Sequence, residues 1–180
     1  RTHDGVDVTA AGGTERYDEV VFACHADEAL ALLDDPSTGE REVLGAFRYQ
    51  ANDTVLHTDA SQLPRDRRAW AAWNALVPRD PADVCTVSYC MNLLQSIESP
   101  EPFVVTLNRT AAIDPERILR RIAYRHPVFD SAAVAAQHRR EELNGTNRTW
   151  YTGAWWRYGF HEDGMRTAVE VANRLGVPWP

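Results

Sequence analysis

Residues 150–164, with the sequence WYTGAWWRYGFHEDG, decide the fold of this chain. Six of the eleven residues from Trp150 to Phe160 are aromatic, and glycines stand at positions 153, 159 and 164. The pattern predicts a strand over 148–153 and, after the stretch, a helix with one apolar face over 164–175. Open α/β sheets bind ligands where a strand ends and a loop leads into a helix. We therefore predict an α/β unit whose ligand lies at this helix N-terminus, where free N–H groups and the helix dipole stabilise an anionic oxygen.

A second interpretation of the same stretch is purely structural. Trp155, Trp156 and Tyr158 would then cover the edge of a core, because aromatic side chains dominate burial. The acidic residues Glu162 and Asp163 are favoured at a helix start by the dipole alone. The density of aromatic residues, together with the three glycines, favours a ligand site over this interpretation.

The N-terminal part of the chain carries strand and helix patterns in α/β order. Val6 and Val8 alternate with polar residues, two glycines follow, and residues 17–24 are rich in apolar side chains. This pattern predicts a hairpin whose second strand is buried on both faces. Asp27 is placed to cap a short helix over 28–33. We expect residues 34–39, DDPSTG, to form a loop close to a domain crossing.

The middle of the chain has a different pattern, in which short strand-like runs alternate with turn-rich links. The predicted strands cover residues 53–58, 69–76, 84–92, 103–108 and 119–125. Runs of this kind joined by short links indicate an antiparallel sheet. After Pro127 the α/β pattern returns, with a helix over 131–143 that Asp130 caps and Gly145 ends.

These patterns predict a mixed α/β and α+β fold built from two domains. Residues 1–40 and 129–180 form an α/β domain, and residues 41–128 form a five-stranded antiparallel sheet inserted into it. The two ends of the chain are therefore expected to meet in one domain.

Composition narrows the classes of function. The 180 residues include 19 basic and 26 acidic side chains, a net charge of −7, with no block of basic residues, so we expect no nucleic-acid binding. No apolar run approaches the ~20 residues of a membrane helix, so we expect no transmembrane segment. Cys24, Cys85 and Cys90 are too few for a disulfide scaffold and predict reduced thiols in a cytoplasmic protein.

Residues 149–164 resemble the carboxy-terminal flavin-binding segment of the flavin-containing amine oxidase superfamily. The resemblance is to a bacterial group described as NAD/FAD-binding, amine-oxidase-like oxidoreductases. Four further stretches resemble the same group in the same order: YDEVVFACH at 17–25, VLHTD at 55–59, AAWN at 71–74 and YRHPVFD at 124–130. The resemblance therefore covers nearly the whole chain, and the last segment is its most specific part.

The resemblance implies an FAD-dependent oxidoreductase that transfers a hydride from an organic substrate, an amine or an unsaturated lipid or isoprenoid, to flavin. It implies an α/β domain that binds FAD and an inserted sheet domain that binds the substrate. The residues implied to contact the cofactor are Gly153, Ala154, Gly159, Phe160, His161, Glu162, Asp163 and Gly164, with Phe160 and His161 nearest the flavin ring.

The expected substrate is a small and apolar molecule, because the predicted sheet is rich in aromatic residues. His57, Tyr89, Tyr124 and His126 are the candidates to face it, and for each of them a hydrogen-bonded structural role is favoured over a catalytic one. Hydride transfer to flavin does not require a protein base. We therefore assign no catalytic residue.

The sequence departs from the family in three places, one of which is a loop between Glu162 and Gly164 that is one residue longer than in typical amine oxidases. Many members carry an acidic residue after the glycine that corresponds to Gly153, and here it is Ala154. No Gly-x-Gly-x-x-Gly occurs, although this motif binds the pyrophosphate of a dinucleotide. We therefore expect the chain, which begins at Arg1, to be a carboxy-terminal fragment that holds part of the FAD site and is inactive alone.

Two other functions are compatible with the residues. The antiparallel sheet could serve a non-enzymatic interaction module. A metal site could draw on Cys24 with His25, on His57 with Asp59, or on residues 161–163, but none of these groups has a recognised ligand spacing. We therefore expect no metal.

Overall fold

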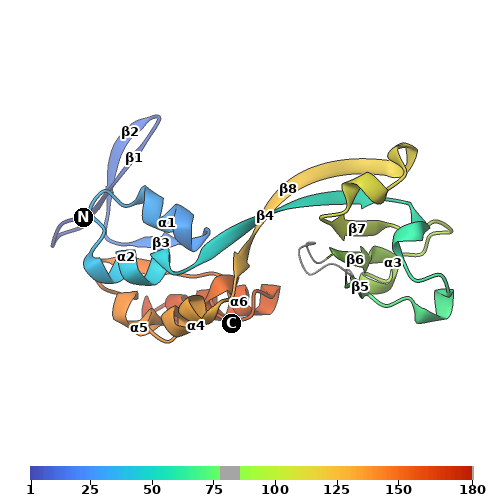
Figure 1. Ribbon diagram of the computed structural model, residues 1–180. Helices are drawn as coiled ribbons and strands as arrows, with labels where there is room; N and C mark the ends of the chain where they lie inside the picture. The colour runs from blue at the N-terminus through green and yellow to red at the C-terminus, as the bar shows by residue number, and fades with distance from the viewer. Residues whose placement is uncertain (78–85, 180) are drawn as a thin grey trace. The chain divides into compact units, whose positions relative to one another are not determined.

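A computed structural model describes residues 1–77 and 86–179 (Figure 1), so Cys85 and the start of the predicted strand 84–92 lie outside the described residues. The chain forms two compact units, Arg1–Gln50 with Pro127–Pro180 and Ala51–His126. We expected the changes of unit at 40/41 and 128/129. No helix of the described residues is long and apolar enough to cross a membrane.

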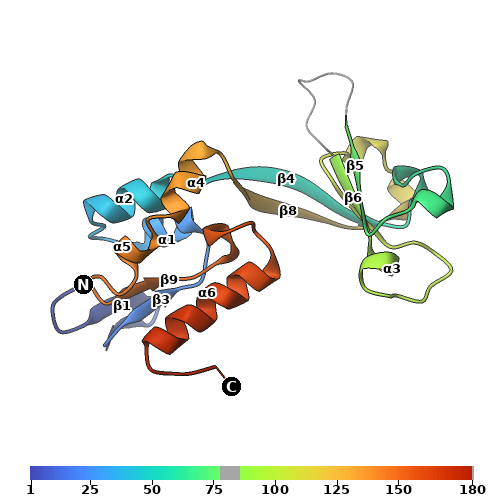
Figure 2. The ribbon, with the colours of Figure 1, turned by 90° about the horizontal axis from the view of Figure 1, so that it is seen from below.

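The first unit is built on a parallel pair of strands with helices on both sides. Its strands are β1 (Val6–Ala10), β2 (Gly13–Tyr17), β3 (Val20–Phe22) and β9 (Thr149–Tyr151), and its helices are α1 (Ala26–Leu32), α2 (Thr38–Gly45), α4 (Ser131–Gln137), α5 (Arg140–Leu143), η5 (Ala154–Trp156) and α6 (His161–Arg174). β3 pairs with β9 in parallel, with Val21 opposite Trp150. Figure 2 shows α6 on one side of this pair and α1 and α2 on the other.

Side chains of β9 alternate between these two helical layers, as the pleat of a strand requires. The Tyr151 hydroxyl donates a hydrogen bond to Glu40 of α2, at 2.6 Å. The Thr152 hydroxyl, just after the strand, lies 2.8 Å from the Thr167 hydroxyl of α6. β9 therefore ties α2 to α6 through consecutive residues.

The core of the first unit is aromatic. Trp155 and Trp156 are buried, with ring centroids 4.2 Å apart, and both rings contact the edge of Phe47. The indole N–H of Trp155 donates to the carbonyl of Cys24, and that of Trp156 donates to the carbonyl of Tyr151, each at 3.1 Å. These two tryptophans are core residues, as the structural interpretation of the stretch proposed.

The predicted N-terminal hairpin is wrong in its second strand. The hairpin closes between Ala10 and Gly13 and ends at Tyr17, and β3 is a separate strand that leaves the hairpin to pair with β9. Val21 of β3 is 44% exposed, so the strand is not buried on both faces.

The helices also differ from the sequence prediction: α1 begins at Ala26 with His25, not Asp27, at its N-cap, and α6 begins at His161, not at 164. Residues 38 and 39, predicted as loop, begin α2, because the Ser37 side chain accepts the N–H of Glu40 and the Glu40 carboxylate accepts the N–H of Ser37. The predicted helix over 131–143 is interrupted at His138 and Arg139 and forms α4 and α5.

The second unit contains a five-stranded antiparallel sheet, as predicted (Figure 1). The strand order is β5 (Trp73–Leu76), β6 (Thr86–Cys90), β7 (Val104–Leu107), β4 (Arg48–His57) and β8 (Ile118–Val128). Shorter elements connect them: η1 (Ala60–Gln62), η2 (Arg67–Ala69), α3 (Met91–Leu94), η3 (Thr110–Ala112) and η4 (Pro115–Arg117). Leu63, Cys90 and Val104 form the core of the unit, and Trp70 packs against them.

Candidate functional site

The segment from the end of β9 to the start of α6 is the candidate site. Gly153 begins it, and a Cβ atom there would lie 2.3 Å from Nε1 of Trp155, so that no larger residue fits. The N–H of Gly153 donates to the Thr167 hydroxyl at 3.0 Å. The end of β9 is thus fixed to α6 at a position where only glycine is tolerated.

Gly164 brings the start of α6 close to the same strand end. A Cβ atom at Gly164 would lie 3.6 Å from the backbone nitrogen of Ala154, which is ordinary contact. Ala154 and Gly164, ten positions apart in the sequence, therefore lie side by side. The structure brings together the predicted residues Gly153, Ala154 and Gly164.

Asp163 shapes the loop between these points. Its carboxylate accepts the N–H of Phe160 at 3.1 Å and the N–H of Tyr158 at 3.2 Å, and it lies 3.6 Å from the Arg157 guanidinium. Through these contacts the Asp163 carboxylate binds the backbone of its own loop. Asp163 therefore positions the turn that leads into α6.

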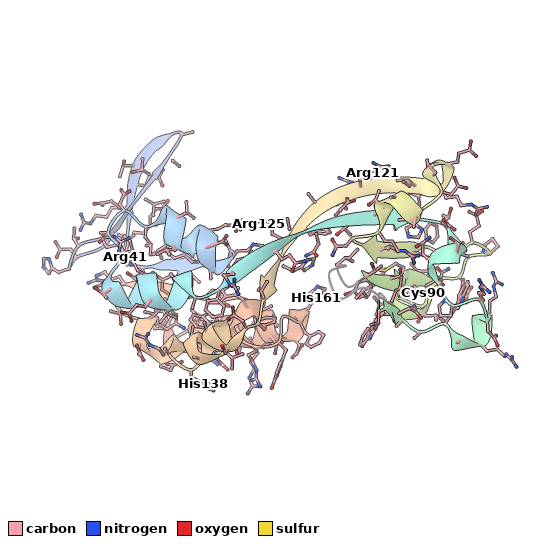
Figure 3. The ribbon with its side chains drawn as sticks, in the orientation of Figure 1. Arg41, Cys90, Arg121, Arg125, His138 and His161 are labelled. Carbon is pink, nitrogen blue, oxygen red and sulfur yellow. The ribbon has the colours of Figure 1, made fainter. Side chains whose placement is uncertain are left out.

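The first turn of α6 presents backbone donors. The N–H groups of His161 and Glu162 have no hydrogen-bond partner among the described residues, since the first turn of a helix lacks intrahelical acceptors. Both side chains are exposed, and Figure 3 labels His161 at this helix start. The helix has 14 residues, long enough for its dipole to add positive potential at this end.

The loop also exposes large apolar side chains. Tyr158 is 74% exposed and Phe160 is 69% exposed. Gly159 between them has φ +90°, and a Cβ atom there would lie 3.3 Å from the Phe129 ring. Exposed aromatic residues grouped on one loop are typical of a surface that contacts a ligand or another part of a protein.

This donor set fits part of a dinucleotide cofactor. The free N–H groups at His161 and Glu162 suit a carbonyl or an anionic oxygen, whereas the space beside Gly153 is filled by the Trp155 ring. Ala154 supplies no carboxylate for a ribose hydroxyl, and the sequence lacks a glycine-rich pyrophosphate motif. Among the described residues, no three His, Cys, Asp or Glu side chains are grouped so that they could hold a metal ion.

The four residues expected to face a substrate are not brought together on one face of the sheet. His57 lies opposite Val104, whereas Tyr89 lies opposite Val105, so these two side chains point to opposite faces. Tyr124 is exposed, and its ring contacts that of His126 edge-on at 6.1 Å. The alternation of the strands separates His57 from Tyr89.

His57 is fully buried in a polar chain across three strands. Its Nδ1 accepts the N–H of Asp59 at 3.1 Å, so Nε2 carries the proton and donates to the Thr106 hydroxyl at 2.8 Å. Thr106 in turn lies 2.8 Å from the Ser88 hydroxyl. Burial lowers the pKa of His57, and the nearby Asp59 charge opposes this only in part. His57 therefore has a structural role in the described residues.

Sequence reasoning missed a buried ionic network in the first unit. The Arg1 guanidinium contacts both carboxylate oxygens of Glu40, at 2.5 and 2.9 Å, and the Thr149 hydroxyl at 3.1 Å. Burial would raise the pKa of Glu40, but the hydrogen bonds from Arg1 and Tyr151 outweigh it and lower the pKa to about 2. The capping box with Ser37 was the one local sequence signal that Glu40 has a structural role. The contact between Glu40 and Arg1 joins residues distant in the sequence and so produces no local sequence pattern.

Comparison with known proteins adds to this geometry. No protein-family model matches the chain, and neither does any curated protein. Several solved structures share its fold, among them these two. One is a protein from Exiguobacterium sp. 255-15 provisionally named a protoporphyrinogen oxidase, with a TM-score of 0.62 and 13% sequence identity. The other is the CLA-producing fatty acid isomerase from P. acnes, with a TM-score of 0.64 and 15% identity.

Both matches include nearly all of this chain but a minor part of the other protein. Each covers 97% of this chain, together with 44% of the Exiguobacterium protein and 45% of the P. acnes protein. The chain thus spans less than half the length of these proteins. The likeness establishes the mixed α/β fold of the described residues.

Proposed function

We propose that this chain is part of an FAD-dependent oxidoreductase of the amine-oxidase-like kind and that the segment 153–164 contributes to its flavin site. The observation that carries the proposal is the pair of free N–H groups at His161 and Glu162, in the first turn of a helix whose Gly164 lies beside Ala154. The proposal is supported by the resemblance of residues 149–164 to a flavin-binding segment. The fold shared with an oxidase and an isomerase agrees with it.

In this proposal each residue of the loop has a definite task. Bound FAD would supply the acceptor for a hydride. The N–H groups of His161 and Glu162 would donate to a ring carbonyl, where negative charge grows on reduction. Gly153 and Ala154 would lie along the backbone of the cofactor, and Gly159 and Gly164 would keep the loop close to it. Phe160 would lie beside the ring and limit access of water to it.

We further propose that the pyrophosphate of FAD is bound by a segment that this chain does not contain. The outer edge of β9 is closed by its own chain, since Gly145 donates to Thr149, Thr149 donates to Thr146, and the Asn144 side chain bonds Tyr151. The outer edge of β3 is open: the N–H and C=O of Val21 have no partner among the described residues. Parallel sheets occur almost only as larger, covered assemblies. A further strand beside β3, leading into a Gly-x-Gly-x-x-Gly turn, would complete both the sheet and the cofactor site.

The proposed substrate is a small apolar molecule, an amine or an unsaturated lipid or isoprenoid, bound by the sheet of the second unit. Trp73 and Tyr89 lie opposite each other on one face of that sheet and supply an apolar surface. We also propose a cytoplasmic location, which the free thiols of Cys24 and Cys90 support.

The test is to read the coding sequence upstream of Arg1 and to express the longest open chain. We expect an in-frame strand, glycine motif and helix, and a purified protein with the absorption bands of a flavin. Exchange of His161 for Pro removes one of the two free N–H groups and should therefore weaken flavin retention. The helix itself should be preserved, because proline is tolerated at the first position of a helix. A colourless protein with no glycine motif in its reading frame would contradict the proposal and favour an interaction module.

A further inference from the structure

The second unit contains a hollow that the proposed flavin chemistry does not use. It has a volume of about 630 Å3 and lies where the link between β7 and β8 meets β4. Its lining residues are Asp53, Asn108, Arg109, Thr110, Ala111, Ile113, Pro115 and Arg121. The volume is in the range of small-molecule sites.

Two arginines line this hollow from different elements. Arg109 precedes η3 and is half-buried, whereas Arg121 lies on β8 and is exposed; Figure 3 labels Arg121 on that strand. Neither guanidinium has an acidic partner among the described residues, although Arg117 nearby is paired with Asp114 at 3.5 Å. A guanidinium presents a planar fork of donors that matches carboxylate and phosphate oxygens.

The hollow contains a single carboxylate, which is partly engaged. The Thr110 hydroxyl donates to Asp53, and the backbone N–H of Asp53 donates to the Asn108 side chain at 3.2 Å. Asn108 itself has φ +59°, a backbone conformation that non-glycine residues seldom adopt, and its side chain also donates to Asn52 at 2.7 Å. Two arginines and one aspartate give the lining a formal charge of +1. Asn108 forms part of this wall in an uncommon backbone conformation.

The remaining wall is apolar. Ile113 is buried beneath the hollow, and Ala111 and Pro115 complete this side. A ligand with an oxyanion at one end and a short apolar portion at the other would complement both the arginines and this wall.

We propose that this hollow binds a small organic oxyanion, a carboxylate or a phosphate ester, between Arg109 and Arg121. Asp53 repels the oxyanion and thereby restricts the site to groups that both arginines can hold. The site lies entirely within the second unit, so the proposal goes beyond the flavin proposal and does not depend on it.

The strand itself offers a matched control. Arg120 and Arg121 are neighbours on β8, both exposed, and successive side chains of a strand point to opposite faces. Arg120 does not line the hollow. The variants Arg121→Gln and Arg120→Gln therefore change the net charge equally but alter the hollow in one case only.

The experiment measures binding of inorganic phosphate and of octanoate to the 180-residue chain by calorimetry, at constant ionic strength. We expect saturable binding of at least one probe, weakened about fivefold or more by Arg121→Gln and by Arg109→Gln, and unchanged by Arg120→Gln. Asp53→Asn should strengthen binding severalfold, because it removes the repelling charge and keeps an oxygen for Thr110. Tighter binding of octanoate would identify a carboxylate ligand, and tighter binding of phosphate a phosphate ester.

Three results would overturn the proposal. They are absence of saturable binding by both probes, equal loss in Arg120→Gln and Arg121→Gln, and weaker rather than stronger binding by Asp53→Asn. Because Arg121 is exposed, its exchange does not endanger folding, and thermal unfolding of each variant checks this directly.

Discussion

Glu40 is a buried carboxylate whose position depends on residues distant in the sequence. Arg1 and Tyr151 bind it from the N-terminus and from β9, and Ser37 binds it within its own helix turn. A charge of this kind is retained only when its partners satisfy it, because an isolated buried charge is costly. We predicted a loop over residues 34–39, so the Ser37 cap was missed, and the local sequence contains no sign of Arg1 or Tyr151.

Exchange of Glu40 for Gln tests this network. The variant leaves the buried Arg1 guanidinium with only the half-exposed Asp35, 2.9 Å away, as its counter-charge, so we expect a loss of about 3 kcal/mol in the free energy of unfolding. Glu42→Gln is the matched control, since Glu42 lies on the same helix and forms an exposed ion pair with Arg139, worth about 1 kcal/mol or less. Urea unfolding of both variants measures the difference, and equal losses would refute the role of Glu40.

The same carboxylate predicts an acid dependence of stability. The pKa of Glu40 is lowered from 4.5 to about 2 in the folded protein, so the unfolded chain binds the proton more tightly. The stabilisation is therefore complete above pH 4.5 and is lost as the pH falls toward 2. The difference in unfolding free energy between the parent chain and Glu40→Gln should shrink over this interval. A difference independent of pH would contradict this assignment.

At the scale of elements, the strands of the second unit were predictable because their signals are local. Alternating apolar residues and prolines in the links predict β6, β7 and β8 to within three positions of their observed ends, whereas β4 begins at Arg48, five positions before its predicted start, and β5 is only the second half of the predicted strand 69–76. The helix α2 was missed because its buried apolar residues are few, Val43 and Leu44, and they follow a stretch typical of a loop. The separation of β3 from the hairpin was missed because the sequence around β3 and around β9 contains no signal that these two strands pair.

The junction between β9 and α6 predicts opposite effects for two glycines. Gly153→Ala places a methyl group in the Trp155 ring and should lower the free energy of unfolding by about 2 kcal/mol or more. A methyl group at position 164 would lie at ordinary contact distance from its neighbours. Gly164→Ala should therefore raise the free energy of unfolding by about 0.5–1 kcal/mol, because alanine favours the helix. Thermal unfolding of both variants gives the comparison, and destabilisation by Gly164→Ala would contradict the packing described.

The polar chain through β4, β7 and β6 predicts a second pH dependence. Burial lowers the pKa of His57 below 6.5, so protonation favours the unfolded chain. The stabilisation is present above pH 6.5 and is lost as the pH falls through the lower folded value. His57→Gln should flatten the dependence of the unfolding free energy on pH in this interval. Similar slopes in the parent chain and His57→Gln would contradict this assignment.

At the scale of the whole molecule, the sequence predicted a mixed fold with a five-stranded antiparallel sheet, and the structure agrees. The motif at 150–164 predicted a loop between a strand and a helix, and the structure has one there. Its role in flavin binding remains a prediction. Sequence could not indicate that Asp163 holds its own loop or that His57 is buried, because both follow from contacts formed after folding.

Flavin retention is the prediction that belongs to this scale. The 180-residue chain supplies N–H donors at α6 but no glycine-rich motif, so FAD added to it should be lost on gel filtration. The longest open chain should keep it. Stoichiometric FAD on the 180-residue chain after filtration would show that the described residues suffice and would remove the need for a further segment.

The open edge of β3 has a consequence for how such a chain behaves during synthesis. An uncovered strand edge accepts any extended segment that reaches it, including the same edge of another copy. Within β3 itself, Val20, Val21 and Phe22 include no charged residue and no proline, so the strand lacks the side chains that discourage a wrong partner. The order in which segments arrive therefore matters: a chain whose correct neighbour strand is already in place stays monodisperse, and one that lacks it is expected to self-associate at rising concentration.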